Sequence, residues 1–264
     1  MKCKWCHNPE SLDLESTQAF YSSKCKGCGK CVSVCQHNAI DNTFNFIREN
    51  CVKCGKCVEK CLYSAREILG YETTVENVLK EVMKDKIFYD RSGGGVTFSG
   101  GEPTFQFDFL LELCQKSKDF GLNVAIETNS FTQYEKLKIL SQYIDTFLMD
   151  IKIIEDEKHI FWTGVSNKII LENIRKVSEE LEKNILFRVP LIPKVNDTFK
   201  DLDLLSDFVK NLKNSHKVEL MPYHDIGVSK YDACGMDYEL RDIKPVDSIT
   251  DAVEYLKSKG IDVI

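Results

Sequence analysis

The sequence lacks three features that would place it in a specialised class. It has 35 basic and 41 acidic side chains, a net charge of −6, so no field of positive charge would gather nucleic-acid phosphates. No apolar run approaches the ~20 residues of a membrane span, and no secretory signal precedes the first motif. We therefore expect a cytoplasmic monomer that binds neither nucleic acid nor membranes.

Cysteine, by contrast, is abundant. The 264 residues contain twelve cysteines, and eight of them fall between residues 25 and 61. A disulfide scaffold would be a short secreted chain, which this sequence does not resemble. The clustering indicates metal ligation.

The eight clustered cysteines form an internal repeat. Both halves read C-x2-C-x2-C-x3-C, the spacing of bacterial two-cluster ferredoxins, in which the fourth cysteine of each run ligates the other cluster. Two zinc sites are the alternative. Gln36 and Leu62 stand where ferredoxins usually have proline. The pattern predicts two 4Fe–4S clusters, one held by Cys25, Cys28, Cys31 and Cys61, the other by Cys35, Cys51, Cys54 and Cys57.

A further thiol pair lies at the start of the chain. Cys3 and Cys6 flank Trp5 and are followed by His7, and this spacing lets two thiolates reach one metal centre from a tight loop. Half of a zinc knuckle, or two unligated thiols, would show the same pair.

From residue 70 the sequence alternates between helical and strand patterns. Residues 11–24 are polar and read as a linker. Repeated βα units with β-branched strands predict an α/β fold with a parallel sheet. The predicted strands are 96–99, 122–127, 146–151, 185–189 and 218–221; the predicted helices are 75–88, 105–120, 134–143, 168–183, 202–212 and 246–259.

Read together, the thiol pair and the downstream segment Ser99-Gly100-Gly101-Glu102-Pro103 resemble radical S-adenosylmethionine (SAM) enzymes. The continuation from Cys6 through His7 to Ser11 resembles the glycyl-radical-enzyme activating enzymes, of the subgroup with a ferredoxin-like insert. Their cluster loop is C-x3-C-x2-C, so the first cysteine would lie two residues before Met1. We expect Met1 to be an internal methionine, with a short strand and the third cysteine upstream.

The resemblance implies a partial (β/α)6 radical SAM barrel whose first strand is missing, formed by residues 1–20 and 69–264. A ferredoxin-like insert would occupy residues 21–68. Gly93-Gly94-Gly95 reads as a flexible approach to the first predicted strand, and Cys114 and Cys234 as buried thiols.

The resemblance also implies the SAM-binding residues. A phosphate loop is the rival interpretation of the glycines, but no Gly-Lys-Ser/Thr or Rossmann spacing follows. Glu127, Thr128 and Asp150 would hold a monovalent cation, and Lys194 replaces a usual glycine, which puts its turn in doubt. The implied SAM contacts are Trp5, His7, Gly100, Gly101, Glu102, Asp150, Ile151, Lys152 and His224.

The implied activity needs three 4Fe–4S clusters and SAM. A flavodoxin or ferredoxin would supply an electron, SAM would be cleaved reductively, and the 5′-deoxyadenosyl radical would take hydrogen from a glycine of a partner glycyl radical enzyme. Two alternatives stay open: an electron-transfer protein that does not cleave SAM, and a radical SAM enzyme with another substrate. Detection of 5′-deoxyadenosine tests the first, and a glycyl radical on a partner tests the second.

Overall fold

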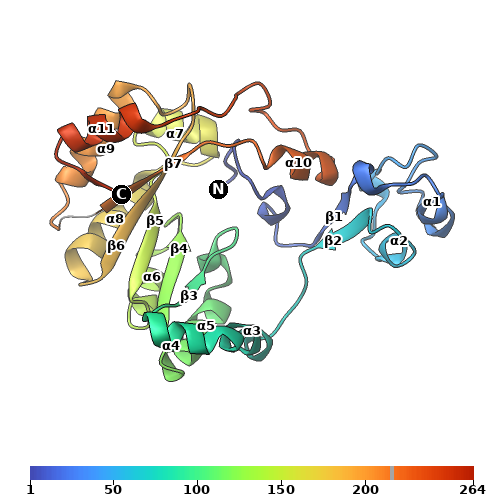
Figure 1. The fold of residues 1–264 in the computed structure, drawn as a ribbon, viewed down its shortest axis with the longest axis horizontal. Coiled ribbons are helices and arrows are strands. Elements are labelled where there is room, and N and C mark those ends of the chain that lie inside the picture. The colour runs from blue at the N-terminus through green and yellow to red at the C-terminus, as the bar shows by residue number, and fades with distance from the viewer. Residues whose placement is uncertain (215–216) are drawn as a thin grey trace. The chain divides into compact units, whose positions relative to one another are not determined.

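The computed structural model describes residues 1–214 and 217–264, which form two compact units (Figure 1). The first unit contains Met1 and residues 73–224 and 243–264, and the second contains residues 2–72 and 225–242. The expected insert, residues 21–68, lies wholly in the second unit, and so do residues 2–20, which the sequence analysis placed with the barrel.

A six-stranded parallel sheet forms the centre of the first unit (Figure 1). Strand order along the sheet follows chain order, and each strand pairs with the next one in the sequence. All five predicted strands are present. The short β8 was not anticipated; it pairs with the start of β7 through Asp262 and Val263. The strands are β3 (Gly95–Phe98), β4 (Asn123–Thr128), β5 (Thr146–Asp150), β6 (Asn184–Leu191), β7 (Lys217–Pro222) and β8 (Asp262–Val263).

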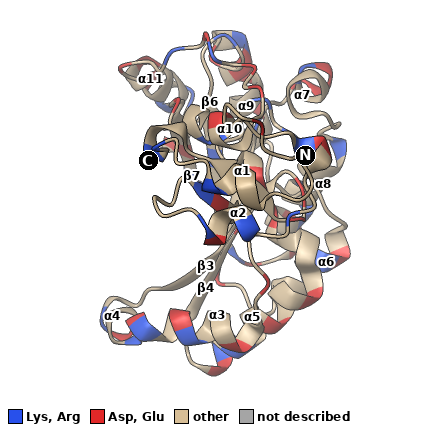
Figure 2. Cartoon of the chain, turned by 90° about the vertical axis from the view of Figure 1, so that its right-hand side faces the viewer, with Lys and Arg blue, Asp and Glu red and all other residues tan. Residues whose placement is uncertain are grey.

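One face of this sheet is fully buried. Alternate residues, such as Ile126 on β4, Phe147 on β5 and Phe187 on β6, are 0% exposed and share one apolar core with helix residues. Figure 2 shows acidic and basic residues interspersed on the outer surfaces of these helices. The helices of the unit are α3 (Val75–Val82), α4 (Lys86–Ser92), α5 (Phe107–Asp119), α6 (Tyr134–Leu140), α7 (Asp156–Thr163), α8 (Lys168–Glu180), α9 (Phe199–Lys210) and α11 (Thr250–Ser258).

The helix expected over 75–88 is interrupted. Helix α3 ends at Val82, a 3-10 turn, η4, spans Met83–Asp85, and α4 continues to Ser92. Gly93 ends α4 in the left-handed conformation at φ 67°. Gly95 is part of β3, where a Cβ atom would run into the backbone of Asn123. The three glycines therefore end a helix and permit close strand pairing, which corrects their interpretation as a flexible approach.

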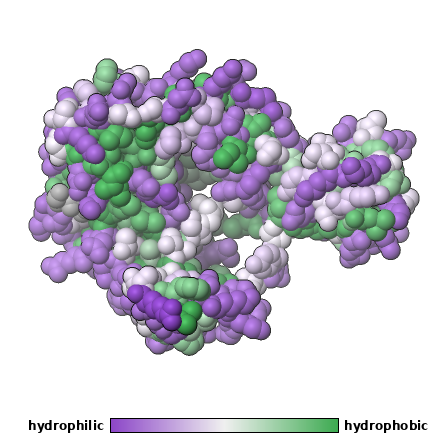
Figure 3. Space-filling model, in the orientation of Figure 1, coloured by the Kyte–Doolittle hydropathy of each residue, from purple (hydrophilic) through white to green (hydrophobic). Residues whose placement is uncertain are grey.

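The second unit is built around a two-stranded antiparallel ribbon of β1 (Thr17–Phe20) and β2 (Arg66–Leu69). Three short helices accompany it: α1 (Lys30–Val34), α2 (Lys56–Glu59) and α10 (Val228–Cys234). The linker expected over 11–24 is wrong in part, because Thr17, Gln18 and Ala19 of β1 are buried. The surface of this unit mixes polar and apolar residues (Figure 3), and Val52 and Leu62 are 57% and 69% exposed.

In the described part of the chain, no helix combines the length and apolarity that crossing a bilayer requires.

Candidate functional site: two cysteine pockets and the strand ends of a parallel sheet

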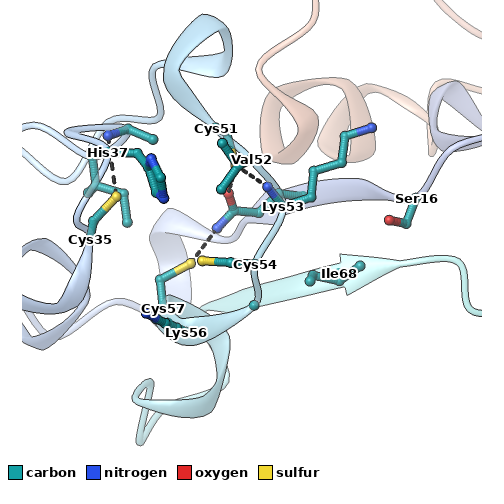
Figure 4. Close-up of a pocket in the computed structure, with 14 residues that line it drawn as sticks. Ser16, Cys35, His37, Cys51, Val52, Lys53, Cys54, Lys56, Cys57 and Ile68 are labelled. Carbon is teal, nitrogen blue, oxygen red and sulfur yellow. Dashed lines mark hydrogen bonds between the residues drawn. The ribbon is translucent and has the colours of Figure 1, made fainter.

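The eight clustered cysteines divide between two pockets of the second unit. The first pocket has an empty volume of about 330 Å³ and is lined by Cys25, Cys28, Cys31 and Cys61. The second pocket, of about 460 Å³, is lined by Cys35, Cys51, Cys54 and Cys57 (Figure 4). Each pocket thus combines three cysteines of one run with the fourth of the other, the grouping that the spacing predicts. That iron–sulfur clusters fill the pockets stays a prediction.

Backbone amides in both pockets point at cysteine sulfur atoms. The N–H of Ala65 donates to Cys61 Sγ at 3.2 Å, and the N–H of Ala39 donates to Cys35 Sγ at 3.3 Å. Burial raises the pKa of Cys61, but the amides of Tyr63, Ala65 and Arg66 and the charge of Arg66 outweigh it and hold that pKa below its usual value. Donors of this kind stabilise thiolates, which are the ligands of iron–sulfur clusters. The donor set therefore fits an anionic cluster in each pocket.

Two buried polar side chains of the ribbon also face these pockets. Gln18, 5% exposed, donates from Nε2 to Cys57 Sγ at 2.8 Å in the second pocket. Arg66, 2% exposed, lines the first pocket. Neither residue was predicted, because nothing in the local pattern distinguishes a buried glutamine or arginine from an exposed one.

The loop with Cys3 and Cys6 belongs to the second unit and is held by α10 and the residues before it. The N–H of Cys6 donates to Cys3 O at 3.0 Å, and the N–H of Asn8 donates to Cys6 Sγ at 3.4 Å. Lys230 Nζ donates to Asn8 Oδ1 at 2.6 Å and forms an ion pair with Glu10 at 2.8 Å. The hydrogen bond from Cys6 to Cys3 closes a tight turn between the two cysteines.

Neighbouring residues of this loop are closely packed. Trp5 is 5% exposed, and Gly227 lies so near His7 that a Cβ at Gly227 would approach the His7 Cα to 3.0 Å. Burial raises the pKa of Tyr231, and Cys6 and Cys3 add to the shift. Gly227 and Lys230 thus hold this loop in place.

In the first unit, Gly100, Gly101 and Glu102 follow the carboxyl end of β3. Gly100 has φ 141°, which favours glycine, and a Cβ there would meet open space. Glu102 Oε1 accepts hydrogen bonds from Thr104 N at 3.1 Å, Thr104 Oγ1 at 2.7 Å and Thr128 Oγ1 at 2.8 Å. Oε2 accepts from Asn129 N at 2.8 Å. The carboxylate therefore joins this loop to the end of β4.

Further polar residues lie at the same edge. Asp150, at the end of β5, forms an ion pair with Lys152 at 2.8 Å, with both side chains largely buried. Glu127 of β4 pairs with Arg188 of β6 and accepts from Ser99 Oγ at 2.8 Å. Because the strands are parallel, these groups share the carboxyl edge, where ligands bind in such sheets.

The implied cation and SAM contacts stay predictions. Glu127, Thr128 and Asp150 are each engaged by other side chains of the unit. Within residues 1–214 and 217–264, no three His, Cys, Asp or Glu side chains are placed to hold a single metal ion. Ile151 is 2% exposed, and His224 follows β7 in an exposed position at the carboxyl edge.

Two asparagine side chains fix the chain after strands β5 and β6. Asn167 Nδ2 donates to the carbonyls of Ile153 and Ile154 at 2.9 and 2.8 Å, and so fixes the chain after β5. His159 is 1% exposed, burial lowers its pKa, and its Nδ1 lies 2.7 Å from Val165 O. Asn196 does the same after β6, donating to Lys152 O and Pro190 O at 2.8 Å each. These residues position the strand ends.

The two thiols outside the motifs are buried, as predicted. Cys114 and Cys234 are both 0% exposed, and burial raises the pKa of Cys114 to about 12. Neither thiol lines a cysteine pocket.

Known proteins resemble the chain over most of its length. The profile of the Radical SAM superfamily matches residues 1–205. The trans-4-hydroxy-L-proline dehydratase activating enzyme of Clostridioides difficile is 44% identical over 245 residues, which cover 90% of this chain and 80% of that protein. The choline trimethylamine-lyase activating enzyme of Oleidesulfovibrio alaskensis is 37% identical over 250 residues, covering 91% and 80%.

A solved structure supports the same placement. A domain of pyruvate-formate lyase-activating enzyme from Bacteroides vulgatus superposes with a TM-score of 0.53 at 27% identity, covering 65% of this chain and 98% of that one. The chain belongs to the radical SAM superfamily and, within it, to the glycyl-radical-enzyme activating enzymes.

Proposed function

We propose that this protein cleaves SAM reductively and uses the resulting radical to install a glycyl radical in a partner enzyme. The observation that carries the proposal is the 44% identity to an activating enzyme over 90% of the chain. The two thiols of the N-terminal loop and the polar strand ends of the parallel sheet are consistent with it.

Cys3 and Cys6 would hold the SAM-binding 4Fe–4S cluster. When bound, this cluster supplies one electron, which splits SAM into methionine and a 5′-deoxyadenosyl radical. That radical takes a hydrogen atom from a glycine, leaving 5′-deoxyadenosine and a glycyl radical. The Asn8 amide donates a hydrogen bond to Cys6 Sγ, and Lys230 fixes the loop.

The chain's own contribution in the first unit is positioning. Gly100 and Gly101 leave room for SAM to approach the backbone, and Lys152 would meet its carboxylate. Glu102 would hold the SAM ammonium group, as the family resemblance implies. Its hydrogen bonds to Thr104, Thr128 and Asn129 support a second task, which is to keep the glycine loop against β4.

We also propose that the first and second pockets each hold a 4Fe–4S cluster in the crossed arrangement. The pocket linings and the N–H···S hydrogen bonds support this assignment. Electrons would enter from a flavodoxin or ferredoxin, in the cytoplasm, through these clusters. Replacing Cys35 with Ala should damage the cluster of the second pocket and spare that of the first, as followed by iron content and electron paramagnetic resonance.

The partner is a glycyl radical enzyme. A trans-4-hydroxy-L-proline dehydratase is the first to test, because the activating enzyme of that dehydratase is the more similar of the two relatives described. Purified protein, reconstituted with iron and sulfide without oxygen, is mixed with SAM, a reductant and the partner. We expect 5′-deoxyadenosine and a glycyl radical signal, both absent from a Cys3→Ala, Cys6→Ala variant. SAM cleavage without a radical on any glycyl radical enzyme would refute the proposal.

A further inference from the structure

Among the described residues, Arg48 and Arg66 both have buried guanidinium nitrogens without a hydrogen-bond partner, and Arg66 is the one of the two whose whole side chain is buried. Arg66, on β2, is 2% exposed, and its guanidinium carbon lies 4.4 Å from the centre of the Phe20 ring. Nη2 donates to Phe44 O at 2.5 Å, whereas Nε and Nη1 are buried without a hydrogen-bond partner. A buried guanidinium is costly unless an acceptor or counter-charge meets it, so this arrangement requires an explanation.

The location of Arg66 supplies that explanation. Arg66, Phe20 and Phe44 all line the first pocket, together with its four cysteines. The second pocket is lined instead by Gln18, a neutral amide that already donates to Cys57 Sγ at 2.8 Å. The charge of Arg66 also acts on Cys57 of the second pocket, but Arg66 lines only the first pocket. The ribbon of β1 and β2 therefore places its positive charge in the lining of the first pocket and a neutral donor in that of the second.

An iron–sulfur cluster on four thiolates is an anion, and one-electron reduction adds a negative charge to it. A cation held in a poorly hydrated site stabilises the reduced form more than the oxidised form, and net charge is among the factors that set cluster potentials. We propose that Arg66 is the counter-charge of the cluster in the first pocket and raises its reduction potential above that of the second pocket. This inference rests on the proposed assignment of a four-iron cluster to each pocket.

The arrangement predicts the direction of electron transfer between the two clusters. With the higher potential at the first pocket, a single electron given to the pair resides there, and the second pocket serves as the entry. No proton or other reactant takes part, because the step is the transfer of one electron between two clusters.

The test is a redox titration of the whole reconstituted protein, followed by electron paramagnetic resonance, with iron content as a separate readout. In Arg66→Gln we expect the equilibrium constant for reducing one cluster to fall about tenfold or more, which corresponds to about 59 mV for one electron. Arg66→Lys keeps the charge and should retain most of the potential. Lys60→Gln removes an exposed charge directly before Cys61, a cysteine of the first pocket, and should leave the potentials of both clusters unchanged. Combination with Cys54→Ala, in the second pocket, assigns the shifted signal.

Each outcome of the titration either supports or overturns the proposed role of Arg66. Unchanged potentials in Arg66→Gln, or an equal shift in Lys60→Gln, would overturn the role of Arg66. If Arg66→Gln loses iron only from the first pocket while Arg66→Lys keeps it at the wild-type potential, the positive charge is required there and the proposal stands. If Arg66→Lys also loses it, the role is structural and the proposal fails. Absence of both insert clusters from the wild-type protein would instead refute the assignment in the proposed function.

Discussion

Replacement of Glu102 by glutamine separates two roles for this carboxylate. Its two oxygens accept four hydrogen bonds, three at Oε1 and one at Oε2. A glutamine can keep its carbonyl oxygen at the Oε1 position, but its amide group then faces the N–H of Asn129. Two donors face each other at a backbone position that is only 9% exposed.

The expected cost follows from this geometry. A buried N–H that loses its acceptor costs about 1–3 kcal/mol. The three remaining hydrogen bonds lose their charge assistance, but the variant is also relieved of a buried charge, since burial raises the pKa of Glu102 against the hydrogen bonds that lower it. We therefore expect a net loss of about 2 kcal/mol, or a fall in the melting temperature of about 4–8 °C.

The assay compares thermal unfolding and SAM binding of the reconstituted wild type, Glu102→Gln and Glu112→Gln. Glu112 is an exposed carboxylate on α5 whose partner is Lys116 at 2.7 Å, so its replacement controls for loss of an ordinary surface charge. Unfolding identical to the wild type, together with abolished SAM binding, would show that Glu102 serves the ligand and not the loop, and our reasoning would be refuted.

Three further predictions concern the first unit. Lys194 has φ 65°, so Lys194→Gly should raise the free energy of unfolding by about 1 kcal/mol in urea denaturation, because glycine adopts this conformation without strain. Gly95→Ala should lower it by about 3 kcal/mol in the same assay, since the added methyl runs into the Asn123 backbone; a variant as stable as the wild type would contradict the strand register. Asp145→Asn should cost about 1–2 kcal/mol at pH 7. Burial raises the pKa of Asp145, but Lys118 and the Val124 amide hold it below its usual value, so this difference should disappear as pH falls below about 4 in denaturation followed across pH.

Sequence patterns predicted the structural features that depend on short-range spacing along the chain. The repeated cysteine runs predict which four thiols line each pocket, because the spacing within a run is fixed by local turns such as those at Gly29 and Gly55, both in the left-handed conformation. Apolar periodicity likewise predicts β4 to β7, since a strand buried on one face alternates in composition.

What escaped prediction depends on partners that lie far apart in the sequence. Thr17 and Gln18 look like linker residues and become a strand only because Leu69 and Ile68 pair with them. The hydrogen bonds that Thr128 and Asn129 donate to Glu102, and the pocket that Arg66 faces, likewise result from the tertiary fold. The turn at Lys194 was questioned because the resemblance implies glycine there, and its positive φ confirms that the position is one that glycine would occupy more readily.

The order of the parallel sheet has a consequence for how the protein is made. From β3 to β8 every strand pairs with the strand synthesised just before it, so no strand has to be inserted between two that are already paired. Contacts between elements close in the sequence lower the entropic cost of folding, and growing chains assemble from their N-terminal side. The first unit can thus add one βα unit at a time during translation, with β8 completing the sheet through the Ile264 amide and Val218 carbonyl at 3.1 Å.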